Sequence, residues 1–272
     1  MPFLCPTRIS CGSDLSASFC GARFGVWGGM TVTWHIPPDL RFDAAVAETS
    51  GRIGRFSVDG VTYWIKRVDR PNLINRLQKG PPLAAFDSDL AAIKALAARG
   101  VPVPPVIGEG PGVFVTRDAG PTLDGLLRNQ TGTVAERVAA FSAAGAALAQ
   151  LHASGISHGR PVLRDLCWQD GKITFLDFEN YRPSRNQPRH FRLDLIIFVL
   201  SCYAEQRSEL PEIVAAKQAY RAQDGLGIWQ MAADWLRNKR WVDIVTKPMQ
   251  WRADPHAREF KSIPLTLRAF AG

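Results

Sequence analysis

The chain has 272 residues, of which 46% are hydrophobic and 21% charged, and this balance excludes collagen-like, coiled-coil and wholly disordered proteins. Its 33 basic and 25 acidic side chains give a formal charge of +8, which favours an anionic partner such as a nucleotide, a lipid headgroup or a nucleic acid. The apolar runs are shorter than the roughly 18 residues of a membrane helix. Five cysteines without a C-x-x-C pair argue against a zinc site and a disulfide framework, so a reduced, cytoplasmic protein is expected.

The first 29 residues differ in composition from the rest of the chain. They are rich in Gly and Ser, include Cys5, Cys11 and Cys20, and have neither a strand-like nor a helix-like period of apolar residues. They also lack the continuous apolar segment of a signal peptide. We expect residues 1–29 to form a disordered extension, or translation to begin at Met30.

Residues 30–118 are predicted to form a small lobe rich in strands. Asp59-Gly60 separates the alternating segments RIGRFSV and VTYWIKRV, which is a strong signal for a β-hairpin. Residues 87–99 have the apolar spacing of a helix, and Gly100 is its expected end. A proline-punctuated segment then leads into a further predicted strand, GVFVTRD.

Residues 119–272 are predicted to be mainly helical. A short helix is expected at TLDGLLRN, and Thr133 with Glu136 forms a capping box for a long Ala-rich helix that ends near Gly155. A second hairpin turns at Asp170-Gly171, and helices continue from Arg192 to about residue 240, with breaks at residues 211 and 225–227. The predicted fold class is therefore α+β, with a small antiparallel β lobe that carries one helix and a larger helical lobe.

Four features with potential chemistry occur in order along the chain. Lys66 ends the hairpin strand, Asp89 lies on the following helix, His158 and Asp165 are seven residues apart after the long helix, and Asp177 follows an apolar strand. Each alone has an ordinary structural explanation. Together, their order is that of protein-kinase-like phosphotransferases.

The chemistry of phosphoryl transfer accounts for these residue types. A lysine on a stiff strand neutralises nucleotide phosphates, and an acid on a helix holds that lysine in position. Two oxygen ligands on separate loops suit Mg²⁺, which prefers carboxylate oxygen. Phosphoryl transfer then requires mostly positioning and charge neutralisation.

Several segments resemble the lipopolysaccharide core heptose kinases, bacterial members of the protein-kinase-like superfamily that are related to the Kdo kinases. The resemblance covers about residues 45–205 and is carried by SGRIGRFSVDGVTYWIKR, DSDLAAIKALAARGVPVPPVIGEG, LHASGISHGRPVLRDL and FLDFE. It implies a two-lobed kinase-like fold that uses ATP and Mg²⁺, with Lys66 on phosphate, Asp89 paired to it and Asp177 on the metal. It also implies that Asp194 braces the catalytic loop, and a helix N-terminal acid explains that residue almost as well.

The catalytic loop departs from the kinase pattern H-R-D-x-x-x-x-N. Aligned on His158, the chain has Arg160 at the position of the catalytic aspartate and Asp165 at that of the metal-binding asparagine. In a second register Asp165 is the base and Asp170 the metal ligand, but Asp170 belongs to a hairpin turn, so the first register is preferred. His158, Arg160 and Asp165 are the candidate catalytic residues, and Asp165 and Asp177 are the candidate metal ligands.

The departures leave two functions open. Arginine is no general base at neutral pH, and because such a base contributes about 10²–10⁴-fold, both a divergent kinase and a nucleotide-binding pseudokinase fit the sequence. The glycine-rich loop is also reduced, to Gly51 and Gly54, with arginines beside them.

The expected acceptor is an anionic small molecule, glycan or glycolipid. Only sixteen residues separate Asp177 from Asp194, which is short for gripping a peptide, and this segment carries Arg182, Arg185, Arg189 and Arg192. The absence of a recognised RNA- or DNA-binding motif argues against a nucleic-acid partner.

The segment 236–261 has seven Lys/Arg and three Asp/Glu beside Trp241 and Trp251. Two structures are compatible with this composition. The tryptophans either pack between helices or contact an anionic membrane from the cytoplasmic side.

Overall fold

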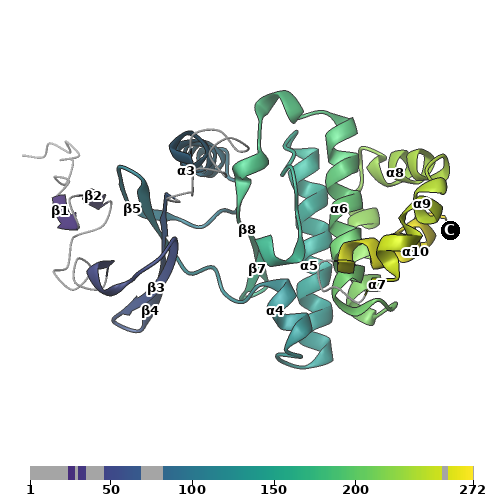
Figure 1. Cartoon of the computed structure of the whole chain (residues 1–272), viewed down its shortest axis with the longest axis horizontal. Coiled ribbons are helices and arrows are strands. Elements are labelled where there is room, and N and C mark those ends of the chain that lie inside the picture. The colour runs from purple at the N-terminus through teal and green to yellow at the C-terminus, as the bar shows by residue number, and fades with distance from the viewer. Residues whose placement is uncertain (1–23, 28–29, 35–45, 69–81, 253–256, 272) are drawn as a thin grey trace, which may run out of the picture.

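The computed structural model describes residues 24–27, 30–34, 46–68, 82–252 and 257–271. An antiparallel sheet with the strand order β1-β2-β5-β6-β4-β3 precedes a helical part that holds a separate two-stranded sheet, β7-β8 (Figure 1). The predicted α+β class and the order of a small antiparallel sheet before helices are confirmed. Within the described residues, no helix is both long enough and apolar enough to cross a bilayer.

The hairpin predicted at Asp59-Gly60 is confirmed. It consists of β3 (Ile53–Val58) and β4 (Val61–Arg67), and both turn residues have positive φ angles, of 52° and 76°. β4 then pairs with β6 (Val113–Arg117), the strand expected from GVFVTRD, and β6 pairs with β5 (Val106–Gly110). Tyr63 and Ile65 are buried against Phe56 and Val58, as the alternation of apolar residues predicts.

The prediction for residues 1–29 is wrong at one place. Phe24–Trp27 forms β1, which pairs antiparallel with β2 (Met30–Trp34) and thereby joins the edge of the sheet. A strand of four residues is too short to produce a detectable alternation in a Gly-rich segment. The three N-terminal cysteines lie outside the described residues.

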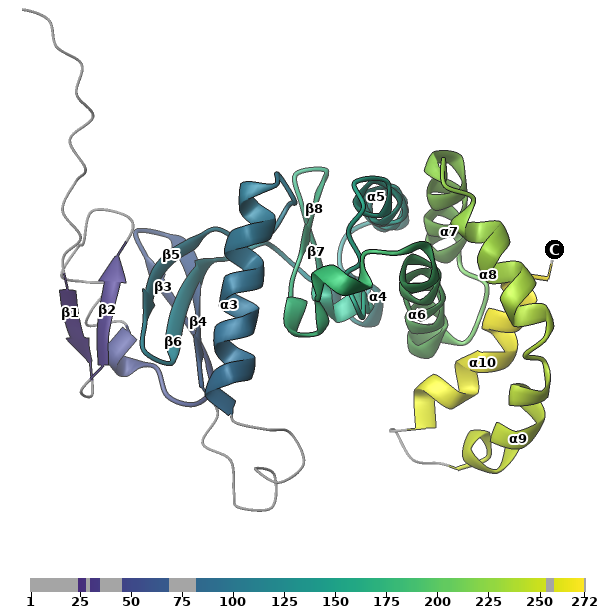
Figure 2. The ribbon, with the colours of Figure 1, turned by 90° about the horizontal axis from the view of Figure 1, so that it is seen from above.

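Helix α3 (Pro82–Ala98) begins five residues before the predicted start and ends before Gly100, whose φ is 76°. It lies on the side of the sheet that faces the helical part (Figure 2). Phe86 and Ile93 of this helix pack with Phe114 of β6. This contact fixes the distance between the helix and the strands that carry the candidate site.

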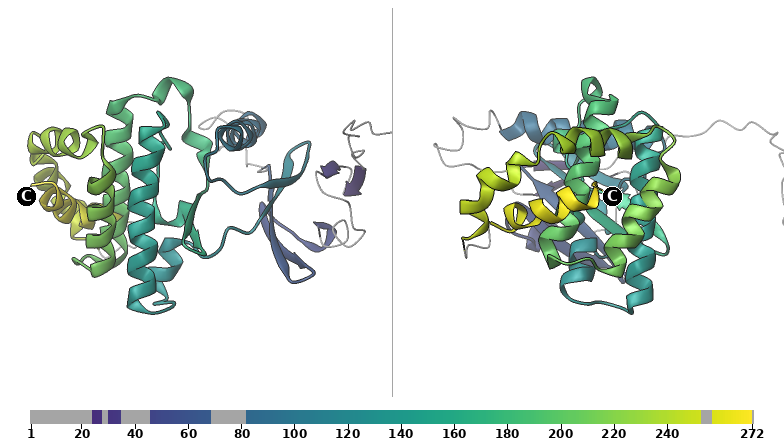
Figure 3. Two further views of the ribbon diagram at one scale, coloured as in Figure 1. Left: turned by 180° about the vertical axis from the view of Figure 1, so that it is seen from behind. Right: turned by 90° about the vertical axis from the view of Figure 1, so that its right-hand side faces the viewer.

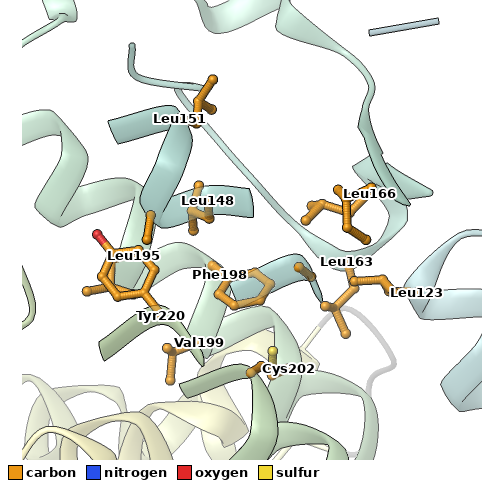
Figure 4. Packing of buried hydrophobic residues seen from close by; sticks show 14 of the residues in the cluster. Leu123, Leu148, Leu151, Leu163, Leu166, Leu195, Phe198, Val199, Cys202 and Tyr220 are labelled. Atoms are coloured by element: carbon orange, nitrogen blue, oxygen red, sulfur yellow. The ribbon is translucent and has the colours of Figure 1, made fainter. Parts of the chain in front are cut away.

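The helical part surrounds a continuous apolar core. Its elements are α4 (Leu123–Arg128), α5 (Val134–Ala153), β7 (Leu166–Gln169), β8 (Lys172–Phe175), α6 (Pro188–Gln206), α7 (Pro211–Gln223), α8 (Ile228–Arg237), α9 (Trp241–Gln250) and α10 (Arg258–Ala269). Leu148, Phe198 and Tyr220 meet in the centre of this core (Figure 4). Helices α8, α9 and α10 cover the end that is remote from the sheet (Figure 3).

Gly145 allows α5 and α7 to lie unusually close together. A Cβ atom at this position would lie 2.0 Å from the carbonyl oxygen of Ala216, so no side chain fits. The capping box predicted for α5 is present, because Thr133 accepts from the Glu136 amide while the Glu136 carboxylate accepts from the Thr133 amide. Both features fix the helix that leads into the candidate catalytic loop.

Candidate functional site

A cavity of about 600 Å³ lies between the large sheet and the helical part. Its apolar walls include Ile65 from β4, Ile93 from α3, Phe114 from β6 and Leu176, which follows β8. Four charged side chains that the sequence singled out also line it, namely Lys66, Asp89, Asp165 and Asp177. An apolar pocket with a few convergent polar groups is the usual form of a small-molecule site.

Lys66 and Asp89 form an ion pair on one wall of this cavity. The distance from Lys66 Nζ to Asp89 Oδ2 is 2.8 Å, so the aspartate on the helix reaches the lysine on the strand. Burial raises the pKa of the Asp89 carboxyl, and the nearby lysine opposes this effect. Asp89 Oδ1 is buried without a hydrogen-bond partner among the described residues.

Asp177 reaches the same lysine from the helical part. It follows β8 and precedes a short 3₁₀ turn, Phe178–Asn180, and its own backbone is left-handed, with φ of 56° and ψ of 63°. This strained conformation brings Asp177 Oδ1 to 3.6 Å from Lys66 Nζ. The same oxygen is buried and accepts no hydrogen bond from the described residues.

Asp165 lies in the 3₁₀ turn Leu163–Asp165, immediately before β7. Burial, and next the negative charge of Asp177, raise the pKa of Asp165 to about 7. Asp170 occupies the turn of the β7-β8 hairpin, is exposed and is not among the residues that line the cavity. The second register, which needs Asp170 as a metal ligand, therefore does not fit the structure.

The carboxylates of Asp165 and Asp177 are of the ligand type that Mg²⁺ prefers. Mg²⁺ is commonly bound by one or two carboxylates, with water and substrate phosphate as its remaining ligands. The orphaned Asp177 oxygen and the raised pKa of Asp165 are what a carboxylate pair without its counter-ion is expected to have. In the described part of the chain, no cluster of three or more His, Cys, Asp or Glu residues could hold a metal ion without other ligands.

Asp194 accepts hydrogen bonds from the loop that contains His158. Its Oδ2 accepts from Ser157 Oγ at 2.8 Å and from the His158 amide at 2.7 Å, and its Oδ1 accepts from the Gly159 amide at 3.0 Å. Asp194 lies near the start of α6, so this helix fixes the loop. The bracing contacts implied by the resemblance are present.

His158 has a structural environment and does not line the cavity. Its ring is fully buried against Phe175 and Phe178, and its Nε2 lies 3.0 Å from the Leu176 carbonyl oxygen. Burial lowers the pKa of His158, which favours the neutral ring. A catalytic role for His158 does not agree with this placement, because it has no route to a ligand, and it instead fixes the backbone just before Asp177.

Arg160 lines a different cavity. This second cavity, of about 560 Å³, lies between α4, α6, the catalytic-loop segment and the start of α10. Arg160 there approaches Glu259 at 3.5 Å, whereas Arg164 lines both cavities. The structure therefore does not bring Arg160 to the group formed by Lys66, Asp165 and Asp177.

The two candidate loop glycines have different environments. Gly51 is exposed with φ of 86°, and a Cβ atom there would meet nothing within 4 Å. At Gly54, a Cβ atom would lie 2.8 Å from side-chain atoms of both Ile65 and Thr49, so this glycine serves packing within the hairpin. Neither is among the residues that line the first cavity, whereas the neighbouring Arg52 is.

Sequence reasoning missed several residues of the first cavity. Thr116 and Asp118 lie at the end of β6, and the Asp118 carboxylate accepts a hydrogen bond from Trp64 Nε1. Arg164 and Cys167 flank Asp165 and its strand. The signal for Asp118 was its place at the end of the strand that joins the two parts, whereas a buried thiol such as Cys167, whose pKa burial raises to about 12, has no sequence signature.

Comparison with known proteins identifies a relative of this chain. A protein of Haemophilus influenzae, described as an uncharacterized protein, is 31% identical over 199 residues, which cover 73% of this chain and 82% of the relative. The chain belongs to the same family as this Haemophilus protein. No protein-family model matches the sequence.

Membership of this family assigns no activity, because the relative carries none in its description. The match covers 73% of this chain and is therefore much longer than any one sequence motif, so the two proteins share most of one fold. The resemblance to the lipopolysaccharide core kinases stays a prediction that rests on the residues quoted for it.

Proposed function

We propose that this protein is an ATP-dependent phosphotransferase with a divergent protein-kinase-like fold. The proposal is supported above all by the convergence of Lys66, Asp89, Asp165 and Asp177 on one cavity. These residues come from a strand, a helix and two separate loops. Their convergence is needed for charge neutralisation at a phosphate and has no evident structural purpose.

Each of these residues has a distinct task in the proposed reaction. Lys66 faces the phosphates of the nucleotide, and Asp89 fixes the lysine at 2.8 Å. Asp165 and Asp177 would hold Mg²⁺, which when bound offsets the negative charge of the transferring phosphate. Asp165 must lose its proton to act as a ligand, and its pKa of about 7 makes that loss accessible near neutral pH.

Arg164 is the side chain of the second cavity that best suits an anionic acceptor, and it adjoins the first cavity as well. Arg128, Arg160 and Arg258 also line the second cavity, but Asp124, Glu205 and Glu259 lie within ion-pair distance of them. Arginine is the preferred residue for recognising phosphate and carboxylate groups. We propose an acceptor that carries such groups, either a small molecule or a glycolipid such as a lipopolysaccharide core, in line with the resemblance.

The alternative function is a pseudokinase that binds nucleotide and regulates a partner protein. The placement of Arg160 favours it, because the residue at the catalytic-aspartate position faces the second cavity and leaves no general base there. Asp165 is the remaining carboxylate near that position. Turnover therefore distinguishes the two functions.

The test is transfer of radiolabelled γ-phosphate from Mg-ATP to purified lipopolysaccharide inner-core oligosaccharide, with release of inorganic phosphate measured in parallel. We expect multiple turnovers that fall by at least about 100-fold in Asp165→Asn, while the exposed hairpin-turn variant Asp170→Asn matches the wild type. Binding of Mg-ATP without any loss of γ-phosphate would instead favour the pseudokinase. Full activity of Asp165→Asn would contradict the site.

A further inference from the structure

Helix α9 presents its apolar side to solvent. Trp241, Ile244 and Val245 are 54%, 71% and 60% exposed, and Trp251, just after the helix, is 79% exposed. Pro248 is exposed as well, and none of the residues of α9 is buried. At 3.6 residues per turn these five positions fall on one side of the helix, so we call them the α9 apolar face.

The polar residues of α9 occupy the opposite, partly buried side. Gln250 Nε2 donates to Asp243 Oδ1 at 2.9 Å and to Thr246 Oγ1 at 3.0 Å, and Lys247 Nζ lies 3.2 Å from Asp243 Oδ1. The preceding helix has the ordinary arrangement, with Trp229 and Leu236 buried. Helix α9 therefore differs from α8 in that its apolar side chains face solvent, and hydrogen bonds and an ion pair among its own polar residues stabilise this orientation.

A contiguous apolar face of this kind marks a binding surface. It lies at the end of the molecule that is remote from the sheet, where α9 forms an outer edge (Figure 2). Both cavities are lined by other segments, so a ligand in either of them leaves the α9 apolar face uncovered.

The surroundings of this face are basic. Lys239, Arg240 and Arg252 flank it, and Lys239 Nζ lies 5.9 Å from the centroid of the Trp241 ring. Asp243 is already engaged by Lys247. Among the described residues, no carboxylate lies within ion-pair distance of Arg240 or Arg252, so their charge is available to an anionic partner.

We infer that the α9 apolar face docks on an anionic lipid bilayer, with the helix lying in the plane of the interface. Tryptophan at each end of an apolar strip with basic flanks is the composition of an interfacial helix. A second copy of the chain fits less well, since five side chains fall short of the roughly 20–30 residues a side of a stable dimer. Pairing two such faces would also bring Arg240 and Arg252 of both copies together. The inference does not depend on the proposed phosphotransferase activity.

The experiment is flotation of the full chain with two kinds of vesicle. One consists of phosphatidylcholine alone, and the other of equal parts of phosphatidylcholine and phosphatidylglycerol. We expect binding to the anionic vesicles that weakens as salt is raised, and little binding to the neutral ones. Each of Arg240→Ser and Arg252→Ser should weaken binding about fivefold.

The apolar contribution is tested with Ile244→Ser/Val245→Ser. Because both side chains are exposed, this variant should keep the thermal midpoint of the wild type and lose at least about tenfold in vesicle binding. The matched control is Leu226→Ser/Met231→Ser, which removes two exposed apolar side chains outside α9 and should bind as the wild type does. Equal binding to both vesicle types would overturn the inference, and so would unchanged binding of the Ile244→Ser/Val245→Ser variant. It would also be overturned if the wild type does not bind vesicles but forms a concentration-dependent dimer that this variant abolishes.

Discussion

Two buried aspartates in the helical part have opposite environments. Asp194 accepts hydrogen bonds from one hydroxyl and two backbone amides at 2.7–3.0 Å. Asp165 is also buried, but its nearest basic group is Arg164 Nε at 3.7 Å, and the charge of Asp177 acts against its ionised form. The same residue type thus accepts several hydrogen bonds from the protein at one site and faces an opposing negative charge at the other.

This difference separates structural from functional carboxylates more clearly than burial does. A carboxylate with its donors in place stabilises the fold. One that lacks them destabilises its own ionised form until a cation arrives. Raised pKa values of carboxyl groups and orphaned oxygens are common at functional sites for this reason. Among the described residues, the orphaned oxygens of Asp89 and Asp177 and the raised pKa values of Asp89 and Asp165 lie at the first cavity, whereas burial also raises the pKa of Glu205 at the second.

The largest effect is expected from removing the satisfied carboxylate. Asp194→Ala leaves three buried donors without an acceptor, so we expect a loss of more than about 3 kcal/mol in the free energy of unfolding. Asp194→Asn keeps one acceptor oxygen and should lose less. Urea denaturation measures both, and wild-type stability of Asp194→Ala would contradict the bracing role.

Replacing Asp165, in contrast, should increase the free energy of unfolding. The pKa of Asp165 is about 7 in the folded chain against a reference value of 3.8, so between these values the folded state holds a proton that the unfolded state has lost. Stability in the absence of ligand therefore falls as the pH rises through this window and levels off above it. Asp165→Asn removes the fall and should raise the free energy of unfolding at pH 8 by on the order of 2 kcal/mol, which allows for partial solvent screening.

Urea denaturation of both proteins across this pH range isolates the contribution of Asp165, because all other titrating groups are shared. Asp170→Asn serves as the control, since this exposed carboxylate should leave the pH dependence unchanged. A variant that is less stable than the wild type at pH 8 would show that Asp165 stabilises the chain.

The smallest loss of stability is expected from the capping box of α5, where Thr133 pairs with the exposed Glu136. The amide and hydroxyl of Thr133 donate to Glu136, and these hydrogen bonds lower the pKa of the Glu136 carboxyl. Thr133→Ala removes the side-chain half of the capping box and should cost about 1 kcal/mol. Thr131→Ala, an exposed threonine outside the box, should leave the melting temperature unchanged.

The elements of the fold were largely readable from the sequence because their signals are local. The Asp59-Gly60 turn, the capping box at Thr133 and the hairpin around Asp170-Gly171 each depend on a few adjacent residues. Helices α9 and α10 lie within the region predicted to be mainly helical, but their bounds were not predicted, because the individual helices were assigned only to about residue 240. Each contains a proline, Pro248 or Pro264, that the rest of the helix accommodates.

The candidate site was only partly readable, since long-range contacts decide which side chains meet. Lys66, Asp89, Asp165 and Asp177 were placed together by the order of motifs, and the structure brings them to one cavity. Arg160 lines the second cavity because α4, α6 and α10 pack around its loop. This packing could not be predicted from the sequence of the loop alone. The outward direction of Trp241 depends likewise on polar contacts within α9.

The most direct test of the central claim is the thermal midpoint of the full chain with and without Mg-ATP, measured beside Lys66→Ala and Asp177→Ala. The exposed Lys172→Ala is the matched control. Saturating Mg-ATP should raise the midpoint of the wild type and of the control by about 5–10 °C, since a ligand at 100 times its dissociation constant adds about 2.7 kcal/mol. Both cavity variants should lose this shift. An unshifted wild type, or shifts of equal size in all four proteins, would contradict a nucleotide and metal site at Lys66 and Asp177.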